Sequence, residues 1–75
     1  MRYLNFSVVI EEDKNGFFAF CPELQGCYTQ GKNYEEAMEN IKDAIKLHVK
    51  DRLADKTEKM ERPKSITLSM VEVGV

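Results

Sequence analysis

The chain opens with short apolar stretches and continues with apolar residues that recur every three or four positions. The stretch 4–12 is rich in β-branched and aromatic residues, which predicts a first strand. Residues 17–21 form a second stretch of this kind, and Pro22 ends it because proline cannot donate to a sheet ladder. After a corner at 23–26, we expect a short third strand at 27–30.

A long helix is expected next, because the apolar spacing changes to the helical period. Asn33 is suited to cap its start, and Glu36 follows three residues later, as in a capping box. The helix is expected to end near Leu53, where nearby basic residues suit the helix dipole. The residues that share its broad apolar face are Tyr34, Ala37, Met38, Ile41, Ala44, Ile45 and Val49.

The last part of the chain predicts a charged connector at 55–64 and a fourth strand at 65–73, where apolar and polar residues alternate. The order βββαβ predicts a single α+β domain over residues 1–75. Its sheet is expected to be mainly antiparallel, with one helix packed on one face. A domain of 75 residues has a small core, so we expect self-association to add stability.

The first hairpin is predicted to turn at Asn15–Gly16, which is typical of a type I′ turn. A two-residue loop pairs Ile10 with Cys21, whereas a four-residue loop at 13–16 pairs Ile10 with Ala19. Both registers have the same parity and therefore divide the side chains between the faces in the same way. One face holds Phe6, Val8, Ile10, Phe17, Ala19 and Cys21, and the other holds Val9, Phe18 and Phe20 together with Tyr3 and Glu11.

The two faces are expected to have different neighbours. Ala19 and Cys21 are small enough to let the helix approach, so we expect it to cover their face. The other face is left open, and two phenylalanines on one strand form the kind of apolar patch that marks an interface, although scattered exposed aromatics are common. We therefore expect a second copy or a partner to contact Val9, Glu11, Phe18 and Phe20.

Composition narrows the possible functions. The net charge of −2 and the pI near 5.4 argue against a nucleic-acid-binding protein. The sequence has no signal-peptide pattern and no apolar run long enough to span a membrane, so a cytoplasmic location is expected. In that compartment Cys21 and Cys27 stay reduced, and small core packing is the preferred interpretation of both residues.

No candidate for catalysis emerges from the residues. The acidic run 11–13 lies beside a turn, whereas a two-metal site needs carboxylates that converge from several elements. His48 is the only histidine, and it lies on the apolar face of the predicted helix without an obvious activating partner. The glycines match no phosphate-binding pattern. We therefore expect neither an enzyme nor a bound metal or cofactor.

An ordered set of short motifs resembles the N-terminal domain of the HicB-family antitoxins over roughly residues 6–53. Gln25 stands where the family commonly has proline, and Asn33 where it commonly has threonine. The matching residues are Asp13, Gly16, Phe17, Pro22, Leu24, Gly26, Cys27, Gly31, Glu36, Ala37, Asn40, Ile41, Ala44 and Ile45.

The resemblance implies a partial RNase H-like βββαβ fold and a short stand-alone antitoxin. The implied partner is a small basic RNA-cleaving toxin of the HicA type, whose catalytic histidine the antitoxin blocks. Because the sequence ends at Val75, just after the expected last strand, we expect no DNA-binding unit in this chain. The alternatives are a homo-oligomeric scaffold or regulatory binding module without a toxin and, less favoured, a metal-dependent nuclease.

Overall fold

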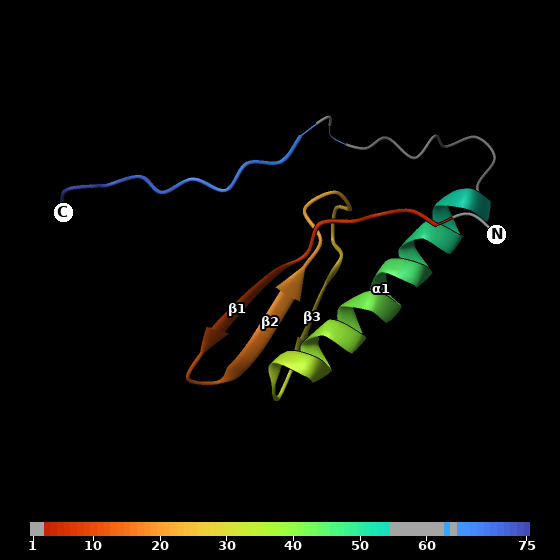
Figure 1. Ribbon diagram of the computed structural model, residues 1–75, viewed down its shortest axis with the longest axis horizontal. Coiled ribbons are helices and arrows are strands. Elements are labelled where there is room, and N and C mark those ends of the chain that lie inside the picture. Colours follow the sequence, from red (N-terminus) through yellow and green to blue (C-terminus); the bar gives the residue numbers. More distant parts are fainter. Residues whose placement is uncertain (1–2, 55–62, 64) are drawn as a thin grey trace.

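The computed structural model describes residues 3–54, 63 and 65–75. An antiparallel sheet in the order β1-β2-β3 is formed by β1 (Val9–Asp13), β2 (Gly16–Phe20) and β3 (Tyr28–Gly31). The helix α1 (Tyr34–Ala54) lies on one face of this sheet and packs against β3 and β2 (Figure 1). The predicted α+β class, with three antiparallel strands followed by a helix, is confirmed.

The register of the β1–β2 hairpin follows one of the two predicted alternatives. Ile10 pairs with Ala19, and the ladder closes where Asp13 pairs with Gly16. The alternative register, with Ile10 opposite Cys21, is wrong. Because both registers have the same parity, the division of side chains between the two faces is still the predicted one.

The tip of this hairpin consists of Lys14 and Asn15 rather than Asn15 and Gly16. The predicted type I′ turn is wrong, because Asn15 does not have the positive φ that such a turn requires. The Asp13 carboxylate instead accepts a hydrogen bond from the Asn15 backbone N–H at 2.7 Å, which stabilises the turn locally. Gly16 follows with a φ of 136°, a conformation that favours glycine.

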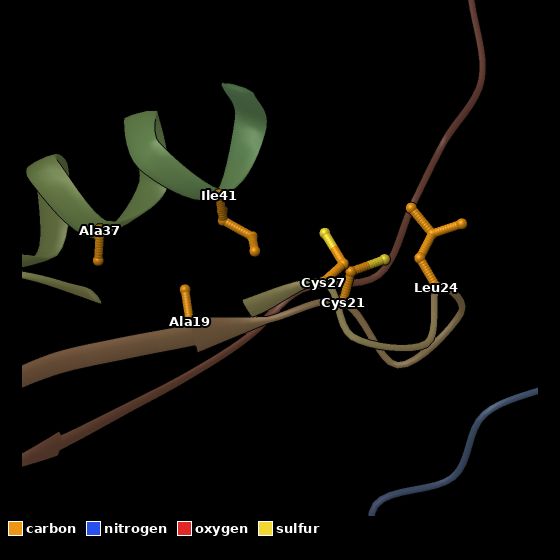
Figure 2. Packing of buried hydrophobic residues seen from close by; sticks show 6 residues of the cluster. All are labelled: Ala19, Cys21, Leu24, Cys27, Ala37 and Ile41. Carbon is orange, nitrogen blue, oxygen red and sulfur yellow. The ribbon is translucent and has the colours of Figure 1, made fainter. Parts of the chain in front are cut away.

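Small residues lie where α1 comes closest to the sheet. Ala19 of β2 and Ala37 of α1 point toward each other across the helix–sheet interface, and Ile41 lies one helical turn further along (Figure 2). A Cβ atom at Gly31 would lie 2.5 Å from the backbone nitrogen of Ala37, so the helix can approach β3 this closely only because residue 31 is glycine. The buried core consists of Ala19, Cys21, Leu24, Cys27, Ala37 and Ile41.

The corner between β2 and β3 supplies half of that core. The Cys21 N–H donates to the Cys27 carbonyl at 3.0 Å, and the N–H groups of Leu24 and Cys27 donate to the carbonyls of Cys21 and Leu24, each at 3.1 Å. Gly26 has a φ of 79°, and the buried Leu24 side chain belongs to the same cluster as the two cysteines (Figure 2). The preferred interpretation of both cysteines as small buried core residues is confirmed.

The predicted N-terminal cap of α1 is confirmed. The Glu36 N–H donates to the Asn33 side-chain oxygen at 2.8 Å. The Glu36 carboxylate accepts from the Lys32 N–H at 3.1 Å, one residue before the Asn33 N–H that a capping box would use. Further along the helix, the Asn40 side-chain amide donates to the Gln30 carbonyl at 2.8 Å and ties α1 to β3. These contacts fix where the helix begins and how it lies on the sheet.

The fourth strand predicted at 65–73 is not formed in the structure. Residues 65–75 do not form a strand, every one of them is exposed, and the segment lies apart from the sheet (Figure 1). Residues 4–8, predicted as the start of the first strand, also lack strand structure. Alternation predicts which side chains share a face, but a strand exists only where its backbone meets a second strand. The predicted connector at 55–64 lies outside the described residues, apart from Pro63.

Candidate partner-binding face

Val9, Phe20 and Tyr28 form one row across the three strands, on the face of the sheet opposite α1. Val9 and Phe20 are half-buried, whereas the Tyr28 side chain is 75% exposed. Side chains paired in this way have Cβ atoms about 5 Å apart, so Phe20 lies between an aliphatic and an aromatic neighbour. The row is a continuous apolar strip that ends in a phenol.

Glu11, Phe18 and Gln30 form the neighbouring row. The carboxylate and the amide are exposed on either side of the half-buried Phe18 ring. An open pocket of about 280 Å³ lies beside Phe18 and Gln30 and extends to Lys32 and Glu36 at the start of α1. This row therefore places an aromatic ring between a carboxylate and an amide, and the adjoining pocket adds the charged groups of Lys32 and Glu36.

The structure brings together all four residues that the sequence proposed for partner contact, namely Val9, Glu11, Phe18 and Phe20. It adds Tyr28 and Gln30, which the sequence analysis placed in a strand but not on a face, because no turn motif fixed the register of β3. The six residues of these two rows are called the open face below. Their partner-binding role is a prediction.

Tyr3 was predicted to share this face, and that prediction is wrong. Tyr3 instead lines a groove beside α1, together with Leu4 and Phe6. The parity of the first strand does not extend to Tyr3, because β1 begins only at Val9. Strict alternation of side chains does not extend through a stretch that lacks strand structure.

The acidic run beside the hairpin does not converge on a metal. Glu11 lies on the open face, whereas Glu12 pairs with Phe17, whose ring packs against the helix-covered core. Adjacent strand residues point to opposite faces, so the two carboxylates diverge. Among the residues that the structure describes, no group of His, Cys, Asp and Glu could hold a metal ion. His48 is half-buried on α1, on the other side of the sheet from the open face.

The open face combines aromatic rings with exposed polar groups. Aromatic side chains are enriched in interface cores and among the residues that contribute most to binding. Here Phe18 lies between an exposed carboxylate and an exposed amide, and Phe20 and Tyr28 lie in the neighbouring row. Within the described ranges, no helix combines the length and apolar character needed to cross a bilayer.

The fold and this face define a small α+β domain with one sheet face closed by a helix and the other left open. Residues 6–73 match the family model described as the HicB_like antitoxin of a bacterial toxin-antitoxin system. The chain therefore belongs to this family of antitoxins.

Several relatives share most of the chain. A UPF0150 protein of Helicobacter pylori is 50% identical over 68 residues, which cover 91% of this chain and 93% of the relative. A UPF0150 protein of Thermoplasma acidophilum is 38% identical over 60 residues, or 79% and 86% of the two chains. An uncharacterized 14.9 kDa protein of Haemophilus phage HP1 is 34% identical over 53 residues, 71% of this chain but only 40% of its own. No solved structure gives a significant match.

Proposed function

We propose that this chain neutralises a small basic RNA-cleaving toxin of the HicA type by binding it through the open face. The observation that carries the proposal is the convergence of Val9, Glu11, Phe18 and Phe20 on one surface of the sheet. Membership of an antitoxin family supports a toxin as the partner. The chain acts as a non-enzymatic cytoplasmic inhibitor, without a cofactor and without touching nucleic acid itself.

The open face suits a ribonuclease as its partner. An enzyme that cleaves RNA must attract phosphates and therefore presents positive charge around its active site. Glu11 and the neighbouring acidic hairpin complement that charge and accelerate encounter. The Phe18 and Phe20 rings then lose their remaining contact with water, and full burial of an aromatic side chain contributes roughly 1.5–3 kcal/mol. Inhibition follows because the bound antitoxin covers the surface that RNA needs.

The first experiment is a pull-down with the tagged chain from its native host, followed by identification of the bound protein by mass spectrometry. Recovery of a small basic protein whose RNA cleavage is abolished by this chain supports the proposal. Recovery of the chain alone, as a defined oligomer, contradicts it and supports the alternative of a homo-oligomeric binding module.

The binding surface is tested by the double variant Phe18→Asp/Phe20→Asp. We expect its affinity for the recovered toxin to fall at least about 100-fold, because both apolar anchors become charged. The control is Leu47→Asp on α1, where the wild-type side chain is already 64% exposed and lies on the other side of the sheet. Retained helical circular dichroism shows that each variant is folded. Unchanged toxin affinity in the folded double variant rejects the open face as the site.

The electrostatic part is tested by two neighbouring charge reversals. Glu11→Lys and Glu12→Lys change the net charge by the same amount, but only Glu11 lies on the open face. We expect Glu11→Lys to weaken toxin binding by about 10-fold and to raise its salt dependence, and Glu12→Lys to have a clearly smaller effect. Equal effects from the two variants imply general charge attraction and no contact at Glu11.

A further inference from the structure

A second surface of the molecule is an apolar groove of about 1100 Å³ between α1 and the N-terminal stretch 3–8. One wall comes from the stretch that leads into β1 and the other from successive turns of the helix. Its apolar lining includes Leu4, Phe6, Val8, Met38, Ile45 and Val49. This groove lies on the helix side of the sheet and is therefore separate from the open face.

The groove lies next to β1, an edge strand of the sheet. Within the described residues, β1 pairs only with β2, so the outer edge of β1 presents unpaired backbone groups. The helix packs mainly on β3 and β2, which leaves space beside β1 on the helix side. An edge of this kind is a template for one more strand.

The chain itself contains a segment with the properties of that strand. In residues 65–75, Ile66, Leu68 and Met70 alternate with Thr67 and Ser69. The three apolar side chains are 41%, 87% and 100% exposed, respectively. A row of exposed apolar side chains favours burial against another surface, because transfer of each side chain out of water lowers the free energy.

Three lysines and one glutamate, Glu39, line the groove, so its net charge is opposite to that of the segment. Lys42, Lys46 and Lys50 lie along the groove at intervals of one helical turn. Glu72 is the one charged residue of the segment 65–75, and in a strand it lies on the same side as Leu68. A strand that places Leu68 in the groove therefore also turns the Glu72 carboxylate toward the lysine row.

We infer that residues 65–75 of one copy dock in the groove of a second copy and add a strand beside its β1. Within one chain the segment runs apart from the sheet, so each copy offers both an unfilled groove and an unpaired strand (Figure 1). In a dimer with a twofold axis, the segment of each copy fills the groove of the other and pairs with its β1. The open face stays uncovered in this dimer, so self-association and toxin binding do not compete for one surface.

The segment is tested on the purified full-length chain by light scattering coupled to size-exclusion chromatography. The wild-type chain is expected at twice the 8.7 kDa of a single chain, and Leu68→Asp/Met70→Asp at the single-chain mass. The matched control Thr67→Asp/Ser69→Asp adds the same charge to the polar side of the segment and is expected to remain dimeric. A monomeric wild-type chain, or a dimeric Leu68→Asp/Met70→Asp variant, overturns the inference.

Exchange between copies is tested by complementation. Leu4→Asp places a charge in the groove but leaves the segment intact, whereas Leu68→Asp/Met70→Asp leaves the groove intact. Each variant alone is expected at the single-chain mass, and an equimolar mixture is expected to form a species of twice that mass. A mixture that stays at the single-chain mass overturns the inference, since a segment that folds into its own groove gives that result. No toxin enters either test, so the outcome is independent of the proposed antitoxin activity.

Discussion

Where α1 lies closest to the sheet, the two faces differ in the size of their side chains. On the covered face, Ala19 of β2 meets Ala37 of α1, and Gly31 leaves no room for even a Cβ atom. On the open face, Phe20 and Tyr28 are neighbours in one row. Ala19 and Phe20 are adjacent in sequence, so one strand carries both kinds of surface.

This difference separates stability from recognition. Small residues bring the helix backbone close to the strands, where small changes in volume cause large changes in packing. Large half-buried residues on the open face lose less on truncation, because part of each side chain is already in water. Variants of the covered face are therefore expected to unfold the domain, and variants of the open face to remove binding while the domain stays folded.

The largest expected effect is that of Gly31→Val. A Cβ at this position would meet backbone atoms of Ala37 at 2.5 and 2.9 Å, and backbone atoms cannot move aside as a flexible side chain can. We expect a loss of about 4 kcal/mol or more, which leaves so small a domain largely unfolded. Urea denaturation followed by circular dichroism measures it.

The matched control for that variant is Gly74→Val, where an added Cβ meets nothing within 4 Å. It should leave the unfolding midpoint unchanged. A folded Gly31→Val variant with wild-type stability would show that the helix and β3 are not held at this distance.

Leu24→Ala is expected to cost about 3 kcal/mol, because it leaves a cavity where a fully buried side chain closes the core. Leu47→Ala is the same substitution at a position that is 64% exposed, and its expected cost is below about 0.5 kcal/mol. The urea midpoints of unfolding of the two variants measure the difference in stability between them. Equal costs would mean that the β2–β3 corner does not contribute to the core.

The contrast between the faces is sharpened by Phe17→Ala and Phe20→Ala, the same substitution on opposite sides of β2. Phe17 packs against the core cluster, so its loss is expected to cost about 2 kcal/mol, and that of Phe20 about 1 kcal/mol. Toxin affinity should change in the opposite order, with a loss of at least about 10-fold only for Phe20→Ala. Isothermal titration with folded protein measures that affinity. A greater loss of affinity for Phe17→Ala than for Phe20→Ala would show that the toxin binds the helix-covered face and not the open face.

Much of this arrangement was predictable from the sequence. The parity of the hairpin assigned Ala19 and Phe20 to their faces, although the exact register was open, because both candidate loops shift the pairing by an even number of residues. The capping residues Asn33 and Glu36 located the start of the helix to the residue. Both features depend on residues that are close together in the sequence, so a short sequence pattern is enough to predict them.

The features that the sequence analysis missed depend on distant partners. The strand expected at 65–73 has the right alternation, but no pattern within the segment states which edge it meets. Tyr28 and Gln30 were not assigned to the open face, because the register of β3 is set across the long corner after Pro22. The close approach at Gly31 likewise becomes visible only once α1 lies on β3.

The smallest effect concerns the cap of α1. Asn33→Ala removes the side-chain oxygen that accepts the Glu36 N–H at 2.8 Å, and we expect a loss of about 1 kcal/mol in unfolding free energy. Asn33→Ser keeps an acceptor at the same position, so it should retain most of that stability. The urea midpoints of both variants distinguish the cap from a general packing role. The cap lies just beyond Gly31, where the helix meets β3. If Asn33→Ser and Asn33→Ala cost the same unfolding free energy, the start of α1 is stabilised by its packing on the covered face and not by the cap.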